Sequence, residues 1–237
     1  MNHTDSLVAL DHAKRHAKAH VFDVDHTLTA HSTGTGFARA GLKRGIFRMR
    51  DLMSLPLFYL RYRYGNLDIR DLTREVSSLA GHSRAELTEV AEHAFQSRGI
   101  SELLPNAVAH LSACRATGVP VILASTSLEV VLEPYARYLE LVHIVSSRLE
   151  FAEGKSTGRI VGRPCYAQEK ASRVTTRLSE LSIAPGEAAF YSDSYHDLPS
   201  LGAVGYPFAV NPDRRLRNHA KTMGWPTLSW PAGRSIR

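Results

Sequence analysis

The chain is poor in cysteine and has no long apolar run. Its 237 residues include only two cysteines, Cys114 and Cys165, too few for a disulfide framework or a four-cysteine zinc site. No stretch approaches the roughly 20 apolar residues of a membrane-spanning helix, and the first twenty residues hold no apolar run of the length found in signal peptides. We therefore expect a soluble cytoplasmic protein, with Cys114 packed inside and Cys165 in a loop.

Blocks of like charge are also missing. Lys and Arg number 29 against 23 Asp and Glu, which gives a net charge of +6. A basic surface can favour nucleic acid, an anionic membrane or a phosphorylated substrate. Because the basic residues are spread along the chain, and no basic recognition helix is evident outside residues 37–64, we expect no nucleic-acid partner.

Short apolar runs alternate with helix-like segments. Strands are expected over residues 20–25, 119–124, 141–145, 188–191 and 204–210, and helices over residues 106–116, 128–139 and 168–181. This alternation predicts an α/β fold, a Rossmann-like and mostly parallel sheet with helices on both faces. Pro207 suggests that the last strand lies at an edge of the sheet.

Two segments interrupt the alternation. Residues 31–100 carry helical patterns without a convincing strand, so we expect an inserted all-helical cap, with 1–30 and 101–237 forming the core. Residues 148–162 predict a hairpin that turns at Glu153-Gly154.

One part of the expected cap, residues 37–64, mixes large apolar and basic side chains. The simpler interpretation is an amphipathic helix broken near Pro56. The alternative is a surface for a lipid-like phosphate or for peripheral contact with an anionic membrane. Four arginines in or near this segment are candidates for binding a substrate anion, and the sequence does not choose among them: Arg39, Arg44, Arg48 and Arg50.

Polar side chains follow the ends of the expected strands. They are Asp23-Val24-Asp25-His26-Thr27, Ser125-Thr126-Ser127, the segment 192–197 and Asn211-Pro212-Asp213. Ligands of open α/β sheets bind at the carboxyl ends of the strands. We therefore expect carboxylates and a hydroxyl to gather at one edge, with Lys170 nearby.

The order and spacing of these residues resemble the four motifs of the haloacid dehalogenase-like (HAD) phosphohydrolases. Residues 22–29 resemble the first motif, DxDxT, and a cap between the first two motifs resembles the helical-cap subclass that includes phosphoserine phosphatase. The other matches are Ser125 for the second motif, Lys170 for the third, and Asp193 with Asp197 for the fourth. Ser192 stands where the fourth motif usually has Gly. His26 stands where Gly is frequent, and we expect it to fix a turn.

The resemblance implies a Mg²⁺-dependent phosphomonoester hydrolase that acts through an aspartyl-phosphate on a small organic phosphate, for example phosphoserine. Asp23 would be the nucleophile. Asp25, on the same strand face, would protonate the leaving oxygen and then activate water. The presence of Asp25 favours phosphate-ester hydrolysis over dehalogenation or phosphonate cleavage.

The resemblance also implies a ligand set for the metal. Asp23, the main-chain carbonyl of Asp25 and Asp193 would bind Mg²⁺, with Asp197 just outside this set. Ser125 would donate to a phosphoryl oxygen, and Lys170 would neutralise charge on the aspartyl-phosphate.

Several alternatives remain open at this point. The same site would serve a phosphatase for lipid-type phosphates or a phosphotransferase, and a non-catalytic binding module is disfavoured because the residue set is complete. Thr126 or Ser127 could replace Ser125 if the strand ends later, Lys170 could be a surface lysine, and Asp193 and Asp197 could cap a helix. Three histidines are expected in a mobile polar tail rather than a metal site: His12, His16 and His20.

Overall fold

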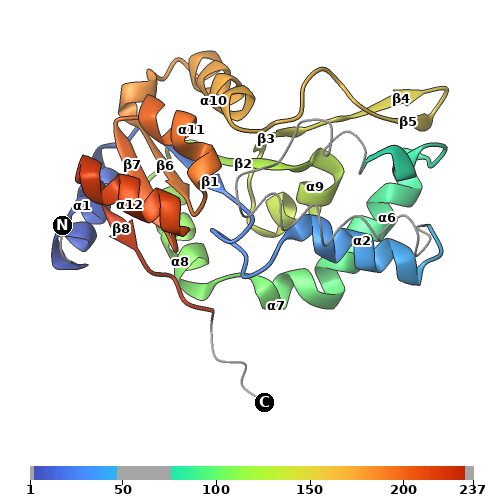
Figure 1. The fold of residues 1–237 in the computed structure, drawn as a ribbon, viewed down its shortest axis with the longest axis horizontal. Helices are drawn as coiled ribbons and strands as arrows, with labels where there is room; N and C mark the ends of the chain where they lie inside the picture. Colours follow the sequence, from blue (N-terminus) through green and yellow to red (C-terminus); the bar gives the residue numbers. More distant parts are fainter. Residues whose placement is uncertain (1–2, 47–75, 233–237) are drawn as a thin grey trace.

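The centre of the fold is a six-stranded parallel sheet (Figure 1). The structure is a computed structural model that describes residues 3–46 and 76–232. The strand order is β3-β2-β1-β6-β7-β8, and each neighbouring pair is parallel. The strands are β1 (Ala19–Asp23), β2 (Val121–Leu128), β3 (His143–Ser147), β6 (Ala188–Ser192), β7 (Tyr206–Val210) and β8 (Thr227–Leu228). The predicted α/β fold class is confirmed.

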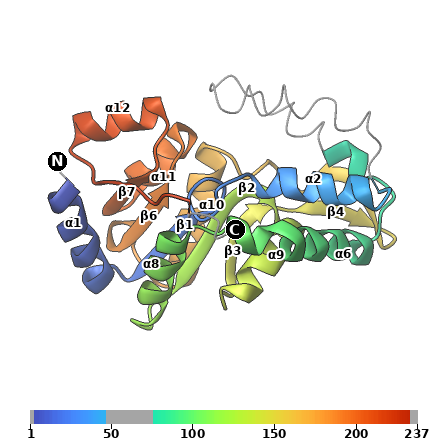
Figure 2. The ribbon, with the colours of Figure 1, turned by 90° about the horizontal axis from the view of Figure 1, so that it is seen from below.

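Helices cover both faces of the sheet (Figure 2). Alternate residues of β1 enter different cores, since Phe22 belongs to one buried cluster and Val21 to the other. The first face is covered by α1 (His3–His16), α8 (Pro105–Arg115) and α9 (Glu129–Tyr138). The second is covered by α10 (Gln168–Glu180), α11 (Leu198–Ala203) and α12 (Arg214–Met223). Single 3₁₀ turns, η3 (Pro185–Glu187) and η4 (Tyr195–Asp197), flank β6.

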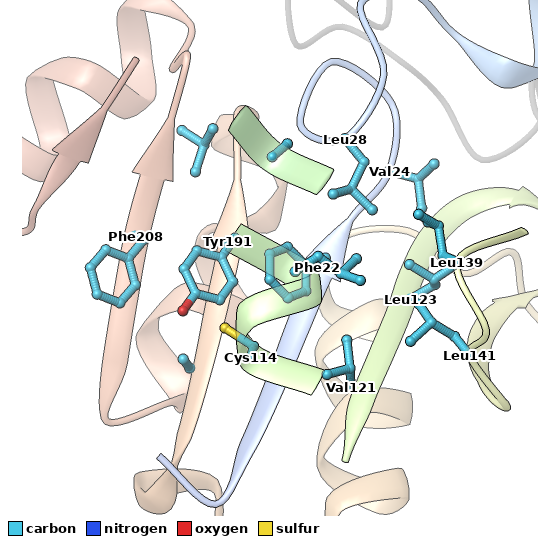
Figure 3. Close-up of a cluster of buried hydrophobic side chains, with 14 of the residues drawn as sticks. Phe22, Val24, Leu28, Cys114, Val121, Leu123, Leu139, Leu141, Tyr191 and Phe208 are labelled. Atoms are coloured by element: carbon cyan, nitrogen blue, oxygen red, sulfur yellow. The ribbon is translucent and has the colours of Figure 1, made fainter. Parts of the chain in front are cut away.

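Three aromatic rings form a ladder across the central strands (Figure 3). Phe22 stacks on Tyr191 with ring centroids 4.4 Å apart, and Tyr191 stacks on Phe208 at 5.0 Å. All three rings are buried, and burial of one large apolar side chain contributes about 1.5–3 kcal/mol. The ladder therefore holds β1, β6 and β7 together one residue before the functional segment that begins at Asp23.

Between the loop after β1 and the start of α8, the described part of the chain is mostly helical. They are α2 (Thr33–Lys43), η1 (Ser77–Leu79), α6 (Arg84–Ala94), the π-helical η2 (Phe95–Gly99) and α7 (Ile100–Glu102). α2 and α6 share a third buried cluster with Val130 and Val131 of α9, whereas Leu132 of α9 belongs to the sheet core. The helix α9 thus contacts both the cap helices and the sheet.

The two chain crossings between sheet and cap lie against each other. The Ala30 N–H donates to the Glu102 carbonyl at 2.7 Å, and the Leu104 N–H donates to the Leu28 carbonyl at 2.8 Å. Between these bonds, Thr29 and Leu103 form an antiparallel bridge. The exit and the return of the cap segment are therefore tied at one point.

The predicted hairpin is confirmed. It consists of β4 (Leu149–Ala152) and β5 (Lys155–Ile160), paired antiparallel and separate from the main sheet. The hairpin reaches the cap segment (Figure 1), since the Gly81 N–H donates to the Ser156 carbonyl and the Ser156 N–H donates to the His82 carbonyl, both at 2.8 Å.

Two expectations about the ends of the chain are wrong. Pro207 does not mark an edge strand, because β8 lies beyond β7; β8 pairs only with Ala209 and Val210, so Pro207 lies outside the paired stretch. The histidines do not lie in a mobile tail, because Ala13 of α1 and the following Ala17 pack on the sheet.

The three histidines do not all lie on one face. His12 and His16 stack on the exposed side of α1, with ring centroids 4.1 Å apart, whereas His20 lies in β1 and is buried. Cys114 is buried as expected, and Cys165, although in a loop, is buried in the second core. No helix in the described ranges is both long and apolar enough to cross a bilayer.

A polar cluster lies inside the first core. The Tyr191 hydroxyl is 3.0 Å from His20 Nδ1 and 3.1 Å from His110 Nε2, and Cys114 Sγ is 3.4 Å from the same His110 nitrogen. Burial lowers the pKa of His20 to about 4, and that of His110 to about 4 as well. Both histidines are therefore neutral in the folded protein at neutral pH.

We expect this cluster to make the fold sensitive to acid. The unfolded chain protonates histidine near pH 6.5 and the folded chain does not, so stability is lost as the pH falls from about 6.5 towards 4. His20→Gln should reduce the loss between pH 7 and pH 5 by on the order of 1–2 kcal/mol, measured by urea unfolding at both values. His12→Gln, on the exposed side of α1, is the control, and the same pH dependence in both variants would contradict the expectation.

Candidate active site

The expected site residues meet at the carboxyl edge of three adjacent strands. Asp23 is the last residue of β1, Ser125 lies near the end of β2, and Asp193 directly follows β6. The chain passes from β1 to β2 and β3 on one side of β1 and later crosses to β6 on the other side, so the direction of the strand order reverses at β1. Such a switch point is where open α/β sheets bind their ligands.

A tight loop after β1 shapes the site. The Val24 carbonyl accepts the N–H groups of Thr27, Leu28 and Thr29 at 3.3, 2.9 and 3.0 Å. His26 has φ 62°, in the left-handed region that His tolerates better than most residues. His26 therefore lies at a turn, as expected, and the turn brings Thr27 back to Asp23.

The centre of the site is the buried ammonium of Lys170. Its Nζ lies 2.6 Å from Asp23 Oδ1 and 2.7 Å from Asp197 Oδ2, and the side chain is only 1% exposed. Lys170 lies in the first turn of α10, which places it beside the edge of the sheet. It is not a surface lysine.

Burial and neighbouring charges shift the pKa values of Lys170, Asp23 and Asp193. Burial alone would lower the pKa of Lys170, but the charges of Asp197 and Asp23 raise it above its usual value. Burial raises the pKa of Asp23, and Lys170 opposes that rise. Burial also raises the pKa of Asp193, and the charges of Asp23 and Asp197 add to the effect. The carboxylates outnumber the one ammonium group, so the site favours a further cation.

Hydroxyl groups hold the carboxylates in place. Thr27 Oγ1 donates to Asp23 Oδ2 at 3.1 Å and accepts the Asp193 N–H at 3.0 Å. Ser192 Oγ donates to Asp197 Oδ2 at 2.7 Å. The serine that departs from the usual glycine thus contacts the carboxylate that pairs with Lys170.

Asp25 is held by two different segments. Its Oδ1 accepts the main-chain N–H of Thr33, at the start of α2, at 2.6 Å, and its Oδ2 accepts the Ser127 hydroxyl at 3.0 Å. Ser125 Oγ accepts the Ser127 N–H at 3.1 Å, so its own proton can be donated to a ligand. The hydroxyl groups of Ser125 and Ser127 therefore have different partners.

Asp213 acts on the site through the loop after β6, and the described candidate arginines lie on the surface. Asp213 caps α12 by accepting the Leu216 N–H at 2.8 Å, and it also accepts the Tyr195 N–H at 2.8 Å, so it braces the loop after β6. Arg39 is exposed on α2. Arg44 forms a surface ion pair with Glu89 at 2.9 Å. Arg48, Arg50 and Pro56 lie outside the described residues.

A cavity that the sequence does not predict borders this edge. Its volume is about 440 Å³, and its lining includes Asp193, His26 and Arg217. The Arg217 guanidinium donates to the Pro212 carbonyl at 3.0 Å.

The sequence does not predict the contacts that Ser192 and Ser127 make with the carboxylates. The only indication in the sequence is position, because each serine lies one or two residues from an acid or a hydroxyl residue of a motif.

The donor groups at this edge fit Mg²⁺. Among the described residues, no three His, Cys, Asp or Glu side chains gather as a complete metal-binding group. Two carboxylates, Asp23 and Asp193, come together through Thr27, and every available donor is an oxygen atom. Mg²⁺ suits such a set, because it commonly uses one or two carboxylates and completes its shell with water and phosphate oxygens.

Comparison with known proteins identifies the family. A haloacid dehalogenase-like hydrolase domain matches residues 20–202. The chain belongs to the HAD-like hydrolase family. A histidinol-phosphatase of Neisseria meningitidis is 29% identical over 216 residues, covering 89% of this chain and 97% of the relative. A phosphoserine phosphatase of Mycobacterium tuberculosis is 30% identical over 220 residues, covering 86% and 68%.

A solved structure has a similar fold. The crystal structure of a Bordetella pertussis protein of unknown function has a TM-score of 0.79 and 29% identity, and the match covers 89% of this chain and 97% of that one. The chain is thus a HAD-like hydrolase whose relatives include enzymes named phosphatases, and Mg²⁺ is the metal that HAD phosphatases generally use.

Loss of the buried ammonium should destabilise the HAD core. Lys170→Met leaves the carboxylates of Asp23 and Asp197 buried without their cation, and we expect a loss of about 3–5 kcal/mol at pH 8. The loss should shrink at pH 5, because unpaired buried carboxylates have raised pKa values and become neutral as the pH falls. Urea unfolding at both pH values measures this.

The control for this prediction is Lys221→Met, which changes an exposed lysine of α12. A loss below about 1 kcal/mol for Lys170→Met, the size of a surface ion pair, would contradict the expectation. An equal loss at both pH values would contradict it too.

Proposed function

We propose that the chain is a Mg²⁺-dependent phosphomonoester hydrolase acting on a small organic phosphate through an aspartyl-phosphate on Asp23. One observation carries the proposal: a nucleophile candidate, an acid/base candidate and a buried cation lie together at the carboxyl edge of β1, as Asp23, Asp25 and Lys170. In the first step, a carboxylate oxygen of Asp23 attacks phosphorus, and the bond between phosphorus and the ester oxygen breaks.

Asp25 is the general acid of the first step and the general base of the second. It gives a proton to the leaving ester oxygen and then, as a carboxylate, takes a proton from the water that attacks the aspartyl-phosphate. The bond between phosphorus and Asp23 then breaks, which releases inorganic phosphate and restores both carboxyl groups. The support for this role is that both oxygens of Asp25 are already held by hydrogen bonds.

Charge stabilisation comes from the surrounding groups. Ser125 donates to a phosphoryl oxygen, and Lys170 offsets negative charge on the aspartyl-phosphate. Asp23, the Asp25 main-chain carbonyl and Asp193 would hold Mg²⁺, with Asp197 positioned through Lys170. When bound, the metal would neutralise charge on the phosphoryl oxygens.

The proposed substrate is a small phosphate ester. Phosphoserine and histidinol phosphate are the first candidates, because two relatives are named for these substrates. We propose residues 31–100 as the cap that selects the substrate. We also propose a cytoplasmic enzyme that acts without a nucleic-acid partner.

Asp23→Asn should lower kcat by about 10³-fold or more, because the amide has neither the charge nor the nucleophilicity of the carboxylate. Phosphate release should be measured with and without Mg²⁺ on amino-acid, sugar, nucleotide and lysophospholipid phosphates. Asp11→Asn, at a half-exposed position of α1, is the matched control. Wild-type turnover in Asp23→Asn would remove Asp23 as the nucleophile.

Asp193→Asn should raise the Mg²⁺ concentration that gives half-maximal activity by about tenfold or more, because one anionic ligand becomes a neutral amide. A magnesium titration of phosphate release measures the effect, and calorimetric Mg²⁺ binding gives an independent readout. An unchanged titration would exclude Asp193 from the metal site.

A further inference from the structure

The hydroxyl of Ser127 contacts the Asp25 carboxyl group, and Ser127 has no role in the function proposed above. Its hydroxyl lies 3.0 Å from Asp25 Oδ2 and 2.9 Å from Thr33 Oγ1. Its main-chain N–H donates to Ser125 Oγ at 3.1 Å. One serine near the end of β2 thus joins the Asp25 carboxyl, the first residue of α2 and the Ser125 hydroxyl.

The hydroxyl of Ser127 restrains a rotation that the backbone leaves open. The terminal torsion of an Asp side chain has a broad, roughly two-fold preference, so a single hydrogen bond does not fix the plane of the carboxyl group. The Thr33 N–H holds Oδ1, and only the Ser127 hydroxyl is seen to hold Oδ2 among the described residues. The two bonds together determine which way the carboxyl group faces.

We propose that Ser127 is a positioning residue for Asp25, distinct in role from Ser125. Its hydroxyl orients the Asp25 carboxyl group towards the ester oxygen that leaves phosphorus, and Thr33 orients the hydroxyl in turn. This inference rests on the proposed function, because it concerns the proton transfer assigned to Asp25.

The role predicts a dependence on the leaving group. A positioned general acid contributes typically 10²–10⁴-fold to a proton transfer. An alkyl phosphate releases a strongly basic alkoxide and needs that proton, whereas p-nitrophenyl phosphate releases a weakly basic phenolate and needs it little. Misorientation of Asp25 should therefore slow the step that releases the leaving group much more for the alkyl phosphate than for p-nitrophenyl phosphate.

The test compares Ser127→Ala with the wild-type protein on both kinds of substrate, in Mg²⁺. On the alkyl phosphate that the wild type hydrolyses best, with phosphoserine and histidinol phosphate tried first, we expect kcat/KM to fall about 10- to 100-fold. On p-nitrophenyl phosphate the fall in kcat/KM should stay below about threefold. We compare kcat/KM because it reports the release of the leaving group and not the later hydrolysis of the aspartyl-phosphate, which is the same for both substrates. Ser127→Thr, which keeps the hydroxyl, should retain most of the alkyl activity.

The matched control is Ser147→Ala. Ser147 is also buried beside the end of β2, where its hydroxyl donates to the Thr126 carbonyl at 2.9 Å and accepts the Cys165 N–H at 2.9 Å. These contacts do not involve Asp25, so loss of the hydroxyl should change kcat/KM on both substrates by the same factor. Melting temperatures show whether each variant is folded, and Ser127→Cys, which keeps the size and weakens the donor, replaces Ser127→Ala if the latter does not fold.

The outcomes separate this inference from the proposed function. A wild-type protein that hydrolyses neither substrate in Mg²⁺ overturns the function itself. An active wild type with an equal loss of kcat/KM on both substrates in Ser127→Ala, or with no loss of kcat/KM, overturns the role of Ser127 alone. The inhibition constant of inorganic phosphate should stay unchanged in Ser127→Ala, since this role does not include binding the phosphoryl group, and a large rise in it would also overturn the role.

Discussion

One buried ammonium group organises the charged groups at the carboxyl edge of the sheet. Lys170 pairs with both Asp23 and Asp197, and these two carboxylates come from segments at β1 and β6 that are far apart in the chain. Without a cation, carboxylates this close together would repel one another and become protonated. The same pairs that hold α10 against the sheet edge also oppose the rise in the pKa of Asp23 that burial causes, so the packing of α10 and the charge of Asp23 depend on the same contacts.

The sheet supplies the framework for this charge. The ladder of Phe22, Tyr191 and Phe208 (Figure 3) aligns three strands. In β1 and β6 the polar segment begins at the next residue, Asp23 or Ser192. Apolar packing and charged groups therefore lie next to each other at the ends of these two strands. A shift of one residue in the pairing of β1 would exchange the two faces of the strand and turn Asp23 away from Lys170.

The sequence predicts those features that are encoded locally. Short apolar runs that end in Asp or Ser indicate β1, β2 and β6, and the same polar ends, with Lys170, predict which side chains gather. Features that depend on distant partners could not be predicted. The helix α1 packs through small alanines, and His20 is buried because Tyr191 lies beside it on the neighbouring strand. The contacts of Ser192 and Ser127 likewise need the fold that brings their partners within reach.

The packing of α9 has a consequence for how the two parts of the chain can fold. Val130 and Val131 belong to the buried cluster of the cap, and Leu132 and Ala136 belong to the core beneath the sheet. A core without its inserted helices would present those valines to water, and an isolated cap would lack one wall. We therefore expect the inserted helices and the sheet to unfold together, and an exchange of the inserted helices for others to require an unchanged apolar surface of α9.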